Sequence, residues 1–77
     1  MNDEMKQWIK AIYSWKHENS MSWQTRLIDL MDVASEENLM KLKTGFPEAY
    51  EAFMLWQQAD SSVDFFLEHG MISKAEA

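Results

Sequence analysis

Apolar residues recur at intervals of three and four along most of this chain, which is the spacing of one face of an α-helix. The first such stretch covers residues 4–17, and its apolar face carries Met5, Trp8, Ile9 and Ile12. Strict alternation of apolar and polar positions, the pattern of a half-buried strand, is absent there. A second stretch covers residues 22–34, with an apolar stripe of Trp23, Leu27, Leu30, Met31 and Ala34. Both stretches predict helices.

Two junctions divide the middle of the chain. If the second helix continued past Ser35, it would place Glu37 and Asn38 on the apolar stripe, so we predict that Ser35 caps a third helix. Gly45 is placed to end that helix in a left-handed conformation. Pro47 then opens a fourth helix, because a proline at the first helical position loses no hydrogen bond.

A fifth helix is predicted to follow. Ser61 and Asp64 have the spacing of a capping box, in which the serine side chain accepts a hydrogen bond from a backbone N–H of the first turn. Gly70 is expected to cap the C-terminal end, and residues 73–77 are expected to fray. The inward positions of this helix are Val63, Phe66 and Leu67.

These elements predict an all-α fold: a compact single-domain bundle of about five short helices over residues 1–72, with the fourth helix at its centre. The chain has only 2 Gly and 1 Pro, which favours a few long elements over many short strands. The predicted core consists of Trp8, Ile12, Trp23, Leu27, Leu30, Leu39, Leu42, Phe46, Phe53, Trp56, Phe66 and Leu67.

The chain is short and lacks cysteine. Its 77 residues are enough for one small domain, whose core is expected to contribute only about 3–5 kcal/mol. Without disulfides or thiolate metal sites, dense packing or self-association must supply the stability, and a reducing compartment such as the cytoplasm is expected. No apolar run approaches the roughly 18–20 residues of a membrane span, and the start of the chain is acidic, unlike a signal peptide.

The charge balance also limits the possible partners. A net charge of −6 repels nucleic-acid phosphates and anionic lipids, so we expect neither direct nucleic-acid binding nor membrane binding. A helix-turn-helix formed by the second and third helices would begin its recognition helix with Glu36 and Glu37, where contacts to DNA are needed.

Catalytic and metal-binding motifs are not evident in the sequence. His17 and His69 are the only histidines and have no cysteine partners, whereas zinc sites need three or four close ligands. The acidic residues around Asp60 resemble a calcium loop only in part, because Phe65 stands where that loop requires glycine. A nucleophilic triad or a glycine-rich phosphate loop is equally unsupported. We therefore predict no enzyme, no cofactor and no metal site.

The fourth helix has more apolar surface than one buried face requires. Tyr50 and Met54 widen its apolar arc to roughly half the circumference, whereas a surface helix needs about 100°. Leu55 lies among the polar residues of the opposite arc. Either the helix is central and touches neighbours on two sides, or part of the arc binds a protein partner inside an acidic rim. The candidate partner-binding residues are Tyr50, Met54, Leu55, Glu51, Asp29 and Asp32.

The favoured interpretation is a small, non-enzymatic, cytoplasmic protein-binding module, which could also be a homodimer. One alternative is an acidic decoy that inhibits a nucleic-acid-binding protein by occupying its basic groove. In size and composition the chain resembles accessory proteins of bacteriophages and other mobile elements. Another alternative is a purely structural homo-oligomer whose apolar patch is buried in the contact between copies of the chain.

Overall fold

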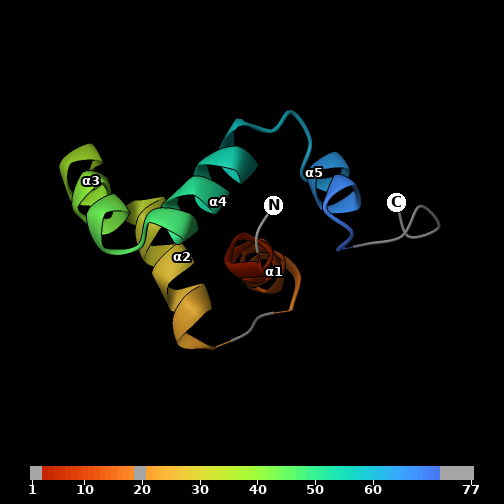
Figure 1. The fold of residues 1–77 in the computed structure, drawn as a ribbon, viewed down its shortest axis with the longest axis horizontal. Coiled ribbons are helices and arrows are strands. Elements are labelled where there is room, and N and C mark those ends of the chain that lie inside the picture. Colours follow the sequence, from red (N-terminus) through yellow and green to blue (C-terminus); the bar gives the residue numbers. More distant parts are fainter. Residues whose placement is uncertain (1–2, 19–20, 72–77) are drawn as a thin grey trace.

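The computed structural model describes residues 3–18 and 21–71 and forms a single bundle of five α-helices, with no strand in this described part of the chain (Figure 1). The predicted all-α class is therefore confirmed. None of the described helices combines the length and the apolar character that crossing a membrane would require. The helices are α1 (Asp3–His17), α2 (Trp23–Val33), α3 (Glu36–Gly45), α4 (Pro47–Gln58) and α5 (Ser62–Glu68).

Local capping hydrogen bonds set the starts of three helices. The side chains of Ser22, Ser35 and Ser61 each accept a hydrogen bond from the backbone N–H three residues later, at 3.3 Å. Such a bond satisfies one of the four free N–H groups at a helix start and stabilises it by about 1 kcal/mol. The caps predicted at Ser35 and Ser61 are confirmed.

The junction between α3 and α4 differs from the prediction. Pro47 does open α4, but Gly45 is the last helical residue of α3 and has no positive φ. Phe46 makes the turn instead, with φ −136° and ψ 67°, and its N–H donates to the carbonyl of Leu42 at 2.7 Å. The left-handed Gly45 was wrong because a proline disfavours the helical conformation in the residue before it, so Phe46 already breaks the helix.

Gly70 ends α5 as predicted. Its φ is +76°, and its N–H donates to the carbonyl of Leu67 at 3.2 Å. The next N–H, of Met71, donates to the carbonyl of Phe66 at 2.8 Å. This pair of bonds is the Schellman arrangement, which satisfies carbonyls that the helix end leaves free. The predicted fraying of residues 73–77 lies outside the described residues.

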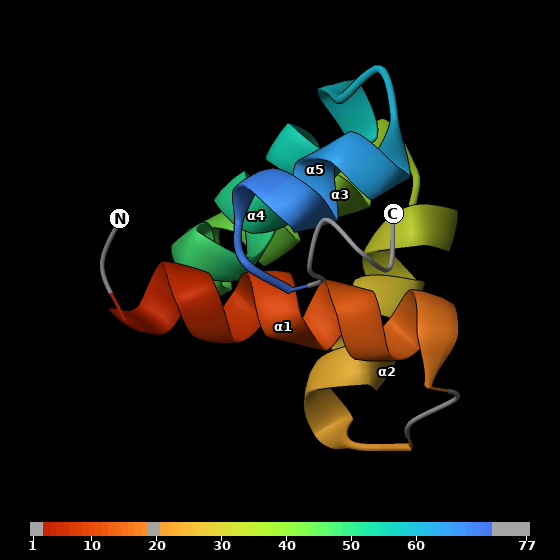
Figure 2. The ribbon, with the colours of Figure 1, turned by 90° about the vertical axis from the view of Figure 1, so that its right-hand side faces the viewer.

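Helices α1 and α4 form the centre of the bundle. α1 packs against α4 and α2, and α4 also contacts α2 and α3. Figure 2 shows α1 with α2 on one side and α4 and α5 on the other. α5 reaches α1 through aromatic rings, with the centroids of Tyr13 and Phe66 5.2 Å apart. The predicted central position of the fourth helix is confirmed, and α1 shares it.

The core contains most of the predicted residues. Trp8, Ile12, Leu27, Phe53 and Phe66 are buried, and four more predicted residues are partly buried: Leu39, Leu42, Trp56 and Leu67. The remaining three were wrong, because their side chains are exposed: Trp23 (59%), Leu30 (49%) and Phe46 (40%).

The rotation of α2 explains two of these errors. Its buried side carries Thr25, Leu27, Ile28 and Met31, and α2 contacts α1 and α4. Turning that side inward leaves Trp23 and Leu30 facing outward. A similar exchange occurs in α5, where Phe65 is buried and the predicted Val63 is exposed.

The two glycines allow a matched test of the helix ends. A Cβ at either position would meet no atom within 4 Å, so only the backbone conformation differs. We expect Gly45→Ala to stabilise the protein by about 0.5–1 kcal/mol, because Gly45 is helical. Gly70→Ala should destabilise it by about 1–2 kcal/mol, because its φ is positive. Urea unfolding followed by circular dichroism measures both; a destabilising Gly45→Ala would contradict the assignment of Phe46 as the turn residue.

Phe53 offers a test of the core. Its ring is 1% exposed, so Phe53→Ala should cost about 3–5 kcal/mol, which approaches the whole stability of a small domain. Val63→Ala, at a side chain that is 47% exposed, is the control and should cost less than about 1 kcal/mol. Urea unfolding again provides the measurement. Equal effects of the two substitutions would contradict the described packing of α4.

Candidate functional site

Four of the six predicted partner-binding residues line one open groove on α4. They are Tyr50, Glu51, Met54 and Leu55, and the groove has a volume of about 480 Å³. The spacing of three and four residues places these side chains on one side of the helix. The groove is completed by Lys43 of α3 and by Pro47 and Gln58 of α4. We call this surface the α4 groove.

The apolar members of the α4 groove are held in place by the fold. Tyr50 and Met54 are partly buried and pack against the core, so their positions are fixed before any partner arrives. Leu55 is 41% exposed. The ammonium nitrogen of Lys43 lies 5.2 Å from the centroid of the Tyr50 ring, within the range of a cation–π interaction. The groove therefore presents the Tyr50 ring, the Met54 thioether and the exposed aliphatic side chain of Leu55 together.

The charges around the α4 groove are mixed. Glu51 is exposed and lines it, but so does Lys43, so its edge carries one acid and one base. The other two predicted rim residues, Asp29 and Asp32, are exposed on α2 and do not line the groove. Asp29 accepts a hydrogen bond from the indole N–H of Trp15 at 3.3 Å. The structure thus gathers the predicted apolar anchors but only one of the three predicted acids.

A second apolar surface lies on α2, where the sequence predicted core. Trp23, Leu30 and Val33 are 59%, 49% and 72% exposed, and their spacing of seven and three residues places them on one face of the helix. Arg26 lies on the same face between them, and Asp29 borders it. We call this surface the α2 outer face. The sequence signal for it was the width of the apolar arc of α2, in which Ile28 and Met31 compete with Trp23 and Leu30 for the buried side.

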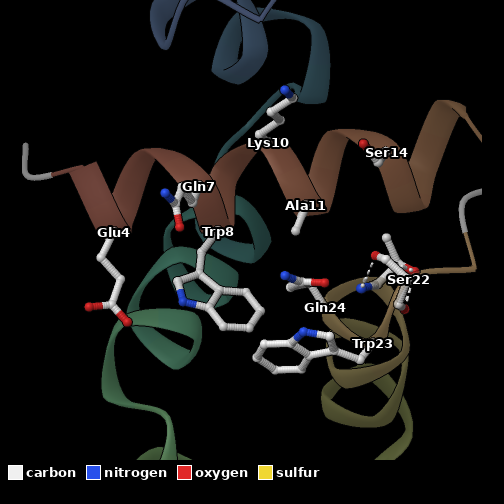
Figure 3. A pocket seen from close by; sticks show the side chains of 10 residues that line it. Glu4, Gln7, Trp8, Lys10, Ala11, Ser14, Ser22, Trp23 and Gln24 are labelled. Carbon is white, nitrogen blue, oxygen red and sulfur yellow. Dashed lines mark hydrogen bonds between the residues drawn. The ribbon is translucent and has the colours of Figure 1, made fainter.

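A hollow of about 350 Å³ separates the first turns of α2 from α1. Figure 3 shows Trp8 of α1 and Trp23 of α2 projecting into it, and their ring centroids are 5.6 Å apart in an edge-to-face arrangement. The Trp23 ring also lies 6.3 Å from that of Phe46. Aromatic pairs at these distances attract one another, so the exposed Trp23 ring is held against two others. Sequence reasoning missed this aromatic row because it placed all three residues in the core.

Candidate chemical groups do not converge within the described part of the chain. No three of its histidines and acids are placed to hold a metal ion. The two histidines pack on neighbouring rings of α5 instead: His17 lies 5.5 Å from Phe66, and His69 lies 4.5 Å from Phe65, measured between centroids. Their contacts are thus with aromatic side chains at the helix ends.

Comparison of the chain with known protein families, with curated proteins and with solved structures found no match. A likeness to another protein therefore supplies no function here. The α4 groove and the α2 outer face each combine exposed apolar side chains with a few charged ones.

Proposed function

We propose that this chain is a small, non-enzymatic protein-binding module that docks a partner protein in the α4 groove. The observation that carries the proposal is the convergence of Tyr50, Met54 and Leu55 on one groove of about 480 Å³. Tyrosine and methionine are enriched at the centres of protein interfaces. Because the Tyr50 and Met54 side chains are already packed, little conformational entropy is lost when they bind.

The groove best fits an amphipathic helix of the partner. Such a helix presents apolar side chains every three or four residues, which matches the spacing of the groove residues along α4. The polarisable thioether of Met54 makes favourable contacts with apolar and aromatic side chains, and the Tyr50 ring supplies a rigid wall. A basic residue of the partner beside Glu51 would complement both that side chain and the net charge of −6.

The polar side chains of the groove are few: it contains one acid, Glu51, and one base, Lys43, beside its apolar members. A lining of this kind suits recognition of a partner through apolar contact. The lack of cysteine supports a reducing, cytoplasmic setting for this module.

An acidic decoy is the second candidate function. Four acids along α2 and α3 are exposed, and the only ion pair among the described residues is Lys41–Glu37 at 4.0 Å. Such a surface could occupy the basic groove of a nucleic-acid-binding protein. The exposed acids are Asp29, Asp32, Glu36 and Glu37.

The proposal is tested by comparing the wild type with Tyr50→Ala/Met54→Ala. Proteins retained from a cell extract are identified, and the affinity of each purified candidate is measured by calorimetry. Removing two interface anchors should lower the affinity for a true partner by about a hundredfold, since each anchor typically contributes more than 1 kcal/mol to binding. The helicity of the double variant, measured by circular dichroism, should stay near that of the wild type.

Two further variants keep the test decisive. Leu55→Glu places a charge in the groove at an exposed side chain, so it should weaken binding without unfolding α4. Val63→Ala on α5 is the control and should bind normally. A partner that binds all of these variants equally would overturn the docking proposal. Binding that falls steeply between low and physiological salt and ignores the groove variants would support the decoy instead.

A further inference from the structure

The α2 outer face is apolar although most of it points away from the rest of the bundle. Along it, Val33 is 72% exposed and Trp23 is 59% exposed, with Leu30 between them. Helices α1 and α4 pack on the side of α2 that carries Leu27, Ile28 and Met31, so they leave Leu30 and Val33 uncovered. Only Trp23, at the edge of this face, touches Trp8 of α1 and Phe46. Isolated exposed apolar residues are ordinary, but three on one helix face form the pattern of an interface.

We propose that the α2 outer face binds the same face of a second copy of this chain. The two α2 helices run antiparallel, and the two-fold axis crosses the contact between the outer faces at the level of residues 27–28 along each helix. In this arrangement Trp23 of each chain lies close to Val33 of the other. Leu30 of each chain lies close to Arg26 of the other. A two-fold pairing of identical surfaces requires that the surface complement itself.

Charge complementarity selects a second copy as the occupant. Arg26 is the only charged residue within the apolar stripe, and it is exposed. Its Nε donates to the backbone carbonyl of Met21 at 3.4 Å, and it forms no ion pair with the described carboxylates. Asp29 lies three residues further along, at the border of the face. Antiparallel pairing places Arg26 of each chain beside Asp29 of the other, so two ion pairs form at once.

Asp29 is suited to this contact. Its Oδ1 accepts the hydrogen bond from the Trp15 indole, which orients the carboxylate, whereas Oδ2 accepts none within the described part of the chain. A guanidinium group from the second copy can therefore donate to Oδ2 without breaking the Trp15 bond.

The dimer would have a functional consequence. The α2 outer face shares no residue with the α4 groove, so pairing through α2 leaves Tyr50, Met54 and Leu55 free on both chains. Two linked grooves would bind a partner with two docking segments more tightly than one groove binds either segment. The dimer itself does not depend on the α4 groove being a binding site.

Light scattering coupled to size exclusion, from low micromolar to several hundred micromolar protein, provides the first test. The expected mass rises with concentration to twice the 9.1 kDa of one chain. Val33→Glu and Arg26→Glu should each raise the dimer dissociation constant about tenfold or more, while Val63→Glu, the same kind of change on α5, should leave it unchanged.

A charge exchange tests the antiparallel register. Arg26→Glu and Asp29→Arg should each weaken self-association, because like charges then face each other at both contacts. Mixed in equal amounts, the two variants should form a heterodimer. In the heterodimer, the chain with Arg26→Glu has acidic side chains at positions 26 and 29, and the chain with Asp29→Arg has basic side chains at both. Opposite charges therefore meet at both contacts. Native mass spectrometry of the mixture reports this directly, and circular dichroism confirms that each variant is folded.

Three results would overturn the inference. The first is a wild type that stays monomeric at every concentration. The second is a dimer that Val33→Glu and Arg26→Glu leave intact, since it would form through another surface. The third is a mixture of folded charge variants that stays monomeric. Asp29→Arg removes the hydrogen-bond acceptor of Trp15 and can therefore fail to fold. In that case the dissociation constant of the Arg26→Glu dimer alone decides: a raised value supports the inference, and an unchanged value overturns it.

Discussion

The packing of α1 against α4 is the constraint on which the other helices depend. Five side chains of this pair are essentially inaccessible to water, and two of them are alanines, whose small size lets the helix backbones approach closely. Helices α2 and α3 then pack against this pair, and α5 joins it through aromatic rings. Because the chain has no disulfide, this apolar contact must supply most of its stability. The five side chains are Ile9, Ile12, Ala49, Ala52 and Phe53.

A core built on one helix pair cannot bury every apolar side chain of a chain this small. The surface-to-volume ratio of a 77-residue domain leaves part of its apolar surface in contact with water. Part of that surplus gathers on two helices, while Met21, Met40, Phe46 and Val63 are exposed elsewhere. On α4 it forms a groove around Tyr50 and Met54, and on α2 it forms a face around Trp23 and Leu30. Concentrated apolar surface of this kind is the property from which both proposed interactions arise.

The two surfaces differ in how they are supported. In the α4 groove, Tyr50 and Met54 are partly buried, so the fold fixes their positions. On the α2 outer face, Trp23 is held mainly by edge-to-face contact with Trp8, while Val33 is largely exposed. This difference is consistent with the two proposed contacts: an inserted side chain of a partner in the α4 groove, and a flat helical surface against the α2 outer face.

Local signals in the sequence determined several of the helix boundaries. The caps at Ser35 and Ser61 and the turn at Gly70 depend on hydrogen bonds between residues only a few positions apart, so they could be predicted without knowing the fold. Helical spacing also predicted that Tyr50 and Met54 share one side of α4. Only the tertiary structure decided which side of α2 is buried. Ile28 and Leu30 are similarly apolar, so the position of the neighbouring helices determines which of the two side chains is covered. For the same reason the sequence alone could not separate core from contact surface: both are apolar, and only packing tells them apart.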